Sequence, residues 1–222
     1  MTLVVTASSA LPVLLLVHGW GLGPGVWRGV RRLLPGWRCH VLDLGFFGTP
    51  QLQVPEGVPL LAVGHSLGFL WLLHHLGRAE WREACVGLVS IAGFSRFSRG
   101  DDFPSGVAPR VLARMRRRMP EDGSGVLRAF CRQGGWSGGG LVVDPAPLIE
   151  GLHWLERWDE RAVLLDWQKP LRVLSAKDDQ IVLPEMTRAC FGSAEWLESG
   201  GHLLPLTKPE ACAKLIMEYS NG

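Results

Sequence analysis

The segment GHSLG, residues 64–68, has the residue types of a nucleophilic serine turn. It follows the apolar run 60–63, which is typical of a buried strand, and it precedes residues 67–77, which have helical periodicity. Glycines on both sides of Ser66 permit a sharp turn that exposes the hydroxyl, and the N-terminus of the following helix favours developing negative charge. The same pattern also occurs as an ordinary glycine turn, but the strand before it and the helix after it favour a nucleophile.

A nucleophilic serine needs a base within hydrogen-bonding distance and a carboxylate that orients this base. Where a strand-turn-helix elbow carries the serine, the order along the chain is serine, acid, histidine. Asp178 and Asp179 follow the apolar run 171–175, and His202 follows the last predicted strand, so both loops are expected at one edge of a sheet. The two aspartates compete as the acid. We favour Asp179, because an apolar pair lies two and three residues after it, and we interpret Asp178 as a solvated neighbour.

Attack on a carbonyl also needs backbone N–H groups aimed at the oxyanion that develops. The segment HGWG, residues 18–21, follows the apolar run 13–17 and is expected to form a loop beside the serine turn. We expect one donor at the amide of Trp20 and the other at the amide of Leu67, directly after Ser66. The alternative for Trp20 is packing alone, as for most of the ten tryptophans, and its position favours a mixed role.

One folded domain must position these residues. The chain has 222 residues and a mass of 24.4 kDa, a length that fits one domain better than two. With 47% hydrophobic and 20% charged residues, its composition is that of a globular protein. Because the net charge is only +2, we expect no nucleic-acid partner.

Short apolar runs alternate along the chain with longer segments of helical period. The strands that we expect are residues 13–17, 39–44, 60–63, 86–92, 171–175 and 195–197. The helices that we expect are residues 25–34, 67–77, 109–119, 147–155, 184–190 and 209–219. Near-continuous apolar runs suit parallel strands that are covered on both faces, so the pattern predicts an α/β protein with a mostly parallel sheet flanked by helices.

Two segments interrupt this alternation. Residues 45–59 are too rich in proline and glycine for a full crossover helix, so we expect that helix to be absent or reduced to a turn. Residues 94–168 contain helices of their own and the glycine-rich stretch 134–140. We therefore expect a core of residues 1–95 and 169–222 and a helical cap, or lid, of residues 96–168.

The predicted cap helix 109–119 is amphipathic. Its apolar side chains fall on one face, and on another fall Arg110, Arg114, Arg117 and Arg118. Residues 96–132 carry five more basic than acidic side chains, which exceeds the net charge of the whole chain. A solvated basic face is the simplest interpretation. The alternative is a docking surface for an acidic partner protein, and a membrane phosphate is a third interpretation.

The cysteines and the opening segment bear on location. The five cysteines are odd in number, widely spaced and without a C-x-x-C pair, which favours the reduced thiols of a cytoplasmic protein over disulfides or a zinc site. Residues 1–17 lack a basic start and contain Pro12, so we expect two strands there and no signal peptide. No apolar run reaches the about 18 residues of a membrane span, and no metal or organic cofactor is expected.

Five segments of the chain together resemble a known enzyme family. They are HGWGLGPGVW, GHSLGF, AGFSRFSRGDDFPSGVAPRVL, AKDDQIVLP and GGHLLPLTKPE. In these segments the chain is similar to the biotin-pathway pimeloyl-[acyl-carrier protein] methyl ester esterases of the BioH type, within the α/β-hydrolase superfamily. The resemblance covers nearly the whole chain. The W-G-L after H-G, the residues Phe97-Ser98-Arg99 and the Asp102-x-Pro104 spacing point to this family, whereas the other motifs indicate hydrolases in general.

The resemblance implies an α/β-hydrolase fold with a small helical cap inserted after strand 6. It implies hydrolysis of the methyl ester of pimeloyl-[acyl-carrier protein] by Ser66 as nucleophile, His202 as base and Asp179 as acid. The matching oxyanion-hole residues are Trp20 and Leu67, through their amides. We further expect the substrate to contact Trp20, Phe94 and Leu203. We also expect a monomer whose acyl-carrier protein docks on Arg110, Arg114, Arg117 and Arg118.

The chain also departs from that family. His65 precedes the serine where such esterases commonly carry tryptophan, Phe69 replaces a small residue, and Ala176 stands where glycine is usual. These differences bear on the substrate more than on catalysis. A broad-specificity short-chain carboxylesterase or thioesterase is therefore the alternative activity. A non-catalytic ligand-binding homologue is the alternative from another class, and the complete set of serine, aspartate and histidine disfavours it.

Overall fold

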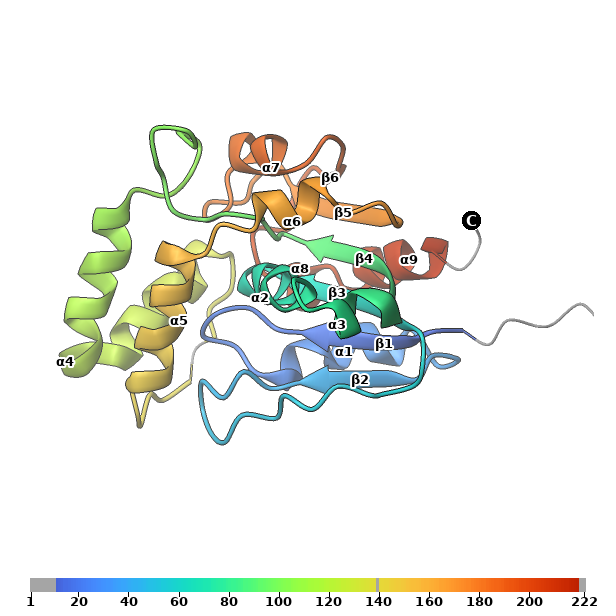
Figure 1. Ribbon diagram of the computed structural model, residues 1–222. Helices are drawn as coiled ribbons and strands as arrows, with labels where there is room; N and C mark the ends of the chain where they lie inside the picture. The colour runs from blue at the N-terminus through green and yellow to red at the C-terminus, as the bar shows by residue number, and fades with distance from the viewer. Residues whose placement is uncertain (1–10, 139, 220–222) are drawn as a thin grey trace, which may run out of the picture.

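The centre of the molecule is a sheet of six strands, all parallel (Figure 1). The structure is a computed structural model that describes residues 11–138 and 140–219. The strands are β1 (Val13–Val17), β2 (Cys39–Leu42), β3 (Leu60–His65), β4 (Cys85–Ile91), β5 (Leu171–Ala176) and β6 (Glu195–Leu197). They lie in the order β2-β1-β3-β4-β5-β6. The parallel α/β sheet that the sequence pattern predicts is thus confirmed.

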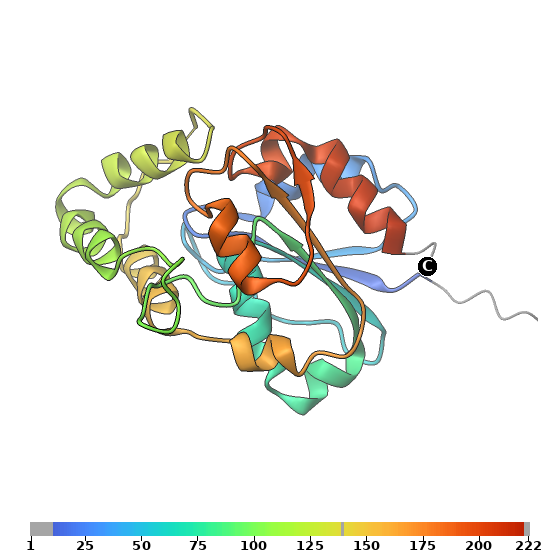
Figure 2. The ribbon, with the colours of Figure 1, turned by 90° about the horizontal axis from the view of Figure 1, so that it is seen from above.

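Helices cover both faces of this sheet (Figure 2). Before the cap they are η1 (Pro24–Trp27), α1 (Arg28–Arg32), α2 (Leu67–Leu76) and α3 (Ala79–Ala84). The later ones are α4 (Pro109–Gln133), α5 (Ala146–Arg157), α6 (Arg161–Leu165), α7 (Pro184–Cys190), α8 (Leu204–Thr207) and α9 (Pro209–Tyr219). The short helices α3, α6 and α8 were not expected, because single helical turns give too few residues to show a period.

Alternating side chains give the sheet two buried faces. In β1, Leu15 and Val17 belong to a hydrophobic cluster that includes residues of α2, α7 and the cap. Leu14 and Leu16 belong to a second cluster that includes residues of α1 and α9. All four side chains are at most 1% exposed. The near-continuous apolar run of β1 is therefore explained by burial on both faces.

The connection between β2 and β3 turns back on itself. Asp43 and Gln51 exchange backbone hydrogen bonds of 3.0 and 2.8 Å in an antiparallel bridge. This bridge explains why β2 ends at Leu42 and not at Leu44, as the sequence pattern predicted. Residues 43–59 form no helix, in agreement with their proline and glycine content. The predicted helix 25–34 is likewise divided, into η1 and α1.

Residues 96–168 leave the sheet after β4 and return to it at β5. Their longest helices, α4 and α5, pack on each other and extend beyond the carboxyl ends of the strands (Figures 1 and 2). This insertion follows the fourth strand of the described sheet and not a sixth, and the first of the two strands expected in residues 1–17 lies outside the described residues. The boundaries assigned to core and cap stay a prediction.

Helix α4 is longer than the predicted helix 109–119 and has a break in its middle. Asp122, two residues after Pro120, has φ −143° and ψ 53°, which is outside the helical region. Its Oδ1 accepts a hydrogen bond of 2.9 Å from the N–H of Gly125, the geometry of an N-cap that starts a second helix. The sequence pattern missed this second half because Gly123 and Gly125 weaken its helical propensity.

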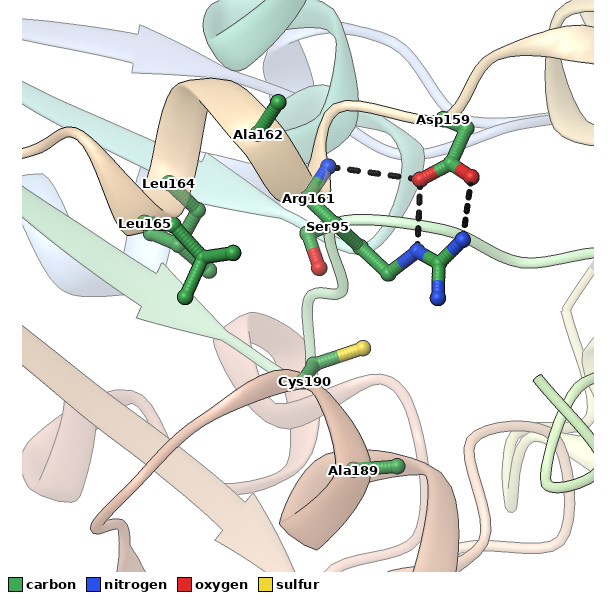
Figure 3. Close-up of a pocket in the computed structure, with 8 residues that line it drawn as sticks. All are labelled: Ser95, Asp159, Arg161, Ala162, Leu164, Leu165, Ala189 and Cys190. Atoms are coloured by element: carbon green, nitrogen blue, oxygen red, sulfur yellow. Dashed lines mark hydrogen bonds and ion pairs between the residues drawn. The ribbon is translucent and has the colours of Figure 1, made fainter. Parts of the chain in front are cut away.

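The segment that leaves the sheet after β4 is hydrogen-bonded to the segment that returns to the sheet before β5. The N–H of Glu160 donates to Ser95 O at 2.8 Å. Arg161 binds Asp159 through Nε at 2.8 Å and also binds Asp102. Ser95, Asp159 and Arg161 border an open hollow of about 560 Å³ (Figure 3). Each nitrogen of the Arg161 guanidinium has a carboxylate or carbonyl partner, so the cluster fastens the base of the cap and leaves no unpaired guanidinium facing the hollow.

The five cysteines are free thiols. Burial raises the pKa of Cys85 to about 11 and also raises the pKa of Cys212, so neither is a thiolate at neutral pH. Within the part of the chain that the structure describes, no helix is both long and apolar enough to cross a bilayer.

Candidate active site

Ser66 lies on a sharp turn between β3 and α2. Its backbone has φ 54° and ψ −125°, a strained conformation for a residue with a side chain. A Cβ at Gly68 would overlap the carbonyl oxygen of Val17, and a Cβ at Gly64 would overlap the backbone of Phe69. Both glycines are therefore required by the close approach of neighbouring chain segments, and the turn that they permit holds Ser66 at the carboxyl end of the sheet.

Three side chains far apart in the sequence are in contact at this turn. His202 Nε2 lies 2.8 Å from Ser66 Oγ, and His202 Nδ1 lies 2.8 Å from Asp179 Oδ2. All three residues are at most 4% exposed. The other carboxylate oxygen of Asp179 accepts hydrogen bonds from the N–H groups of Ile181 and Val182 at 2.8 and 2.9 Å. The arrangement can transfer a proton from the serine to the imidazole while Asp179 orients the ring.

Asp178 has a different set of partners. Its carboxylate is exposed and accepts hydrogen bonds from the N–H groups of Gly200 and Gly201, with a shortest distance to each of 3.0 and 2.9 Å. The interpretation of Asp178 as only a solvated neighbour is therefore incomplete. It connects the loop that carries Asp179 to the loop that carries His202.

Two backbone N–H groups, one directly after Ser66 and one directly after Gly19, where a Cβ would lie 3.0 Å from Ser66 Cβ, are without an acceptor in the described part of the chain. They belong to Trp20 and Leu67, the residues that the sequence analysis expects to form an oxyanion hole. The side chain of Trp20 is 1% exposed and donates from Nε1 to Leu148 O at 2.8 Å. Its ring also packs edge-on against Phe130, with centroids 4.9 Å apart. The cap thus holds the Trp20 side chain while the amide stays available.

His18 stabilises the loop that carries Trp20. Its ring is fully buried, and its Nε2 accepts a hydrogen bond of 3.0 Å from the N–H of Leu44. Since Nε2 is then the acceptor, Nδ1 carries the proton, and it lies 3.0 Å from Gly19 O. His18 therefore fixes the backbone just before Trp20 and does not face Ser66.

His65 precedes the serine and is also fully buried. Its Nε2 lies 3.0 Å from the carbonyl oxygen of His202, so Nε2 carries the proton and donates. Its Nδ1 has no hydrogen-bond partner, and a Cβ at Gly19 would lie 2.9 Å from it. Desolvation, with a smaller effect of the neighbouring His202, lowers the pKa of His65 to about 3. The ring is therefore neutral at neutral pH.

The end of α4 contacts the loops of the acid and the base. The carbonyl oxygen of Gly134 accepts hydrogen bonds from the N–H groups of His202 and Leu203 at 3.0 and 3.3 Å. Gln133 Nε2 donates to Gln180 O at 2.8 Å. Gly134 was noted only as part of the glycine-rich stretch 134–140, and no motif includes Gln133, because their partners lie about 50 to 70 positions away and only the fold brings them together.

A cavity of about 230 Å³ lies between the cap and the core, next to Trp20. Its wall is mostly apolar and is formed from both α4 and α5. The wall includes Trp20, Phe130 and Leu112. Phe130 also packs edge-on near His202, with centroids 6.2 Å apart, so it borders both the cavity and the base, although Ser66 and His202 do not line the cavity. Phe130 belongs to no sequence motif and was not expected at the site.

Two further residues expected to contact the substrate lie in the core. Phe94 is fully buried and packs against Phe97, with ring centroids 4.8 Å apart. Leu203 is also fully buried, next to Gly134. Neither residue lines the cavity beside Trp20, whereas Phe97 does. Their contact with substrate stays a prediction.

The expected arginine face is exposed on α4. It comprises Arg110, Arg114, Arg117 and Arg118. Arg118 pairs with Asp122 at 3.1 Å, and no ion pair is assigned to the other three within the described residues. Arg116, between them, is partly buried and pairs with Glu156 of α5 at 2.7 Å. One arginine therefore joins the two cap helices, and the exposed face is positively charged.

Curated relatives of known name cover almost the whole chain. A pimeloyl-[acyl-carrier protein] methyl ester esterase from Stenotrophomonas maltophilia (strain R551-3) is 30% identical over 95% of this chain and 93% of its own length. A protein of the same name from Xanthomonas campestris pv. campestris (strain B100) is 30% identical over 94% of each chain. The biotin biosynthesis bifunctional protein BioHC from Cellvibrio japonicus (strain Ueda107) is 31% identical over 77% of this chain and 39% of its own length.

Solved structures show the fold. An esterase from Exiguobacterium antarcticum superposes with a TM-score of 0.82 over 96% of this chain and 93% of its own, at 16% identity. A bromoperoxidase from Bacillus anthracis superposes with a TM-score of 0.80 over 95% and 92%, at 15% identity. No family model matches the sequence. The α/β-hydrolase fold expected from the resemblance is thereby confirmed.

Proposed function

The chain belongs to the pimeloyl-[acyl-carrier protein] methyl ester esterase family and is a carboxylic ester hydrolase, and we propose that it hydrolyses the methyl ester of pimeloyl-[acyl-carrier protein]. The pair of 2.8 Å contacts that joins Ser66 to His202 and His202 to Asp179 carries the serine-hydrolase mechanism, and the names of the relatives support this substrate. No metal or organic cofactor enters the proposed reaction.

In the first half-reaction Ser66 Oγ attacks the ester carbonyl, and His202 Nε2 takes the serine proton. The amides of Trp20 and Leu67 stabilise the oxyanion of the tetrahedral intermediate. Asp179 stays ionised and stabilises the imidazolium through Nδ1. His202 then returns the proton to the leaving methoxy group, so that methanol departs and an acyl-enzyme remains.

In the second half-reaction His202 takes a proton from water, and the hydroxide that forms attacks the acyl-enzyme. The same two amides stabilise the second oxyanion. Collapse of this intermediate returns the proton to Ser66 Oγ and releases the free carboxyl end of the acyl group. The acyl chain remains attached to its carrier at the other end.

We propose that residues 96–168 act as the cap of this site. The cavity of about 230 Å³ beside Trp20 is apolar, which suits the methylene chain of the acyl group. The exposed arginines of α4 suit an acidic carrier protein, because a positively charged face speeds encounter and favours one orientation of the partner. Together these features support a carrier-linked substrate over a small free ester.

The proposal is tested by the release of methanol from pimeloyl-[acyl-carrier protein] methyl ester by the purified protein. Ser66→Ala should fold and lower this rate by about 1000-fold or more, because it removes the nucleophile. Ser193→Ala is the matched control, since Ser193 is exposed in the loop before β6. Retention of more than about a tenth of the rate by Ser66→Ala would contradict the assignment.

The carrier is tested by reversing charge on the arginine face. Arg114→Glu combined with Arg117→Glu should lower kcat/KM for the carrier-linked ester by about 10-fold or more at low salt and change hydrolysis of p-nitrophenyl butyrate by less than about 2-fold. The charge-matched control reverses Arg31 and Arg32, exposed on α1. An equal loss on both substrates would contradict carrier docking at this face.

Rescue of a biotin-requiring bacterial strain that lacks its own pimeloyl ester esterase tests the physiological role. Growth without biotin supports the dedicated activity. Hydrolysis of p-nitrophenyl butyrate without rescue would instead favour a broad short-chain carboxylesterase.

A further inference from the structure

The base of the proposed triad, His202, lies on a short loop between β6 and α8. Residues 198–203 form no helix or strand, and the loop is held by bonds to other segments. On one side Asp178 binds the N–H groups of Gly200 and Gly201. Gly201 has φ 63°, in the left-handed region that glycine adopts without strain, so the chain can turn sharply before His202.

The two peptide groups that flank the Cα of His202 are held by different partners. The N–H of His202 donates to Gly134 O at 3.0 Å. The carbonyl oxygen of His202 accepts from His65 Nε2 at 3.0 Å. The next N–H, that of Leu203, makes only a 3.3 Å contact to Gly134 O. Leu203 is itself anchored, because its carbonyl oxygen accepts hydrogen bonds from the N–H groups of Leu206 and Thr207 at 2.8 and 3.0 Å. The carbonyl oxygen of His202 is bonded by His65 among the described residues, and a rotation of that peptide group would swing the imidazole away from Ser66.

His65 is suited to this contact and not to proton transfer. Its ring is fully buried, its Nε2 proton is already donated, and its free Nδ1 lies against Gly19, where a Cβ would come within 2.9 Å. No room for a substrate atom remains on that side. His65 also adjoins the nucleophile in the chain, so the Nε2 contact joins the turn of Ser66 directly to the loop of His202.

We propose that His65 is a positioning residue for the base, holding His202 in line with Ser66 through the hydrogen bond from its Nε2 to the His202 carbonyl oxygen. The inference depends on the proposed function, since it assigns a role relative to the triad. It gives a chemical reason for histidine at this position: Nε2 reaches the His202 carbonyl, and Nδ1 has no hydrogen-bond partner.

The test uses two amide variants that differ only in reach. In His65→Gln the side-chain NH₂ can occupy the place of Nε2, whereas in the shorter His65→Asn it lies near the place of Nδ1 and cannot reach the carbonyl. His65→Phe keeps a ring and removes the donor. Each variant is compared with wild type by kcat and KM for p-nitrophenyl butyrate, after circular dichroism has verified folding.

We expect His65→Asn and His65→Phe to lower kcat by about 10- to 100-fold, because a displacement of about 1 Å of a catalytic group has effects of this order. KM should stay within about 2-fold, since His65 does not line the cavity. His65→Gln should retain kcat within about 3-fold of wild type. The downfield proton NMR signal of the His202 Nδ1–H bonded to Asp179 should persist in His65→Gln and broaden or vanish in His65→Asn.

A matched control uses His40 of β2, whose Nε2 also bonds a backbone carbonyl, that of Gln53, at 2.7 Å. His40→Asn lies at the sheet edge and should leave kcat unchanged. Equal kcat values in His65→Gln and His65→Asn, whether high or low, would overturn the inference, because reach would then be irrelevant. If wild type itself lacks esterase activity, the proposed function fails, and this result is distinct from a failure of the His65 variants.

Discussion

Acidification should lower the unfolding free energy partly because of His65. Replacement of His65 by glutamine should abolish the contribution of this residue to that decrease. Desolvation lowers the pKa of this buried imidazole from 6.5 to about 3 in the folded state. Between those two pH values the unfolded chain binds a proton that the folded protein does not bind. Stability must therefore fall as the pH decreases through this window, with a slope of about 1.4 kcal/mol per pH unit once the unfolded histidine is fully protonated.

The change in unfolding free energy depends on how much of the pH range between the unfolded and the folded pKa of His65 is crossed. On going from about pH 7.5 to about pH 5, the unfolded His65 becomes protonated while the folded ring stays neutral, which costs about 2 kcal/mol of unfolding free energy. The other histidines are common to wild type and variant, so their contributions cancel in the comparison. The loss of stability on acidification should thus be about 2 kcal/mol smaller in His65→Gln than in wild type.

Urea denaturation of both proteins at the two pH values measures this difference. His65→Asn is the control, because it also lacks a titrating ring although its amide cannot reach the His202 carbonyl. It should show the same reduced pH dependence as His65→Gln, whatever its activity. A wild-type loss no larger than that of the two variants would refute the reasoning, since His65 would then be able to take up its proton in the folded protein.

Three further outcomes are expected. Asp179→Asn should lower kcat by about 1000-fold or more, whereas Asp178→Asn should lower it by about 10-fold or less, because only Asp179 contacts the imidazole; steady-state rates on p-nitrophenyl butyrate that rank the other way would reassign the acid. Gly68→Ala should reduce the unfolding free energy by about 1–3 kcal/mol in urea, since its Cβ would overlap backbone at Val17, and an unchanged midpoint would contradict the packing of the turn. Leu112→Ala should enlarge the cavity and raise the octanoate-to-butyrate ratio of kcat/KM for p-nitrophenyl esters by about 3-fold or more, at a cost of about 2–5 kcal/mol in stability; an unchanged ratio would mean that the acyl chain lies elsewhere.

Local chain patterns were sufficient for the sheet and for the serine turn. The runs of β1 and β3 are apolar on successive residues because both faces of each strand are covered, and this property is visible in the sequence. The glycines around Ser66 are likewise visible, because the turn needs them within two residues of the serine. Only the first part of α4 was predicted from the sequence. Its second part begins at an N-cap made by Asp122, among glycines that weaken helical propensity.

The tertiary structure decided the contacts between residues far apart in the chain. Asp178 and Asp179 are adjacent in the sequence, and only the fold turns Asp179 towards His202 and Asp178 towards the glycines before it. Phe130 carries no motif and Gly134 was noted only in a glycine-rich stretch, and they reach the site because residues 96–168 fold back over the carboxyl ends of the strands. His65 was noted as a departure from a familiar pattern, but its role depends on a carbonyl 137 positions further along. A sequence determines what each residue can donate or accept, whereas the partner of that group is fixed by packing across the whole chain.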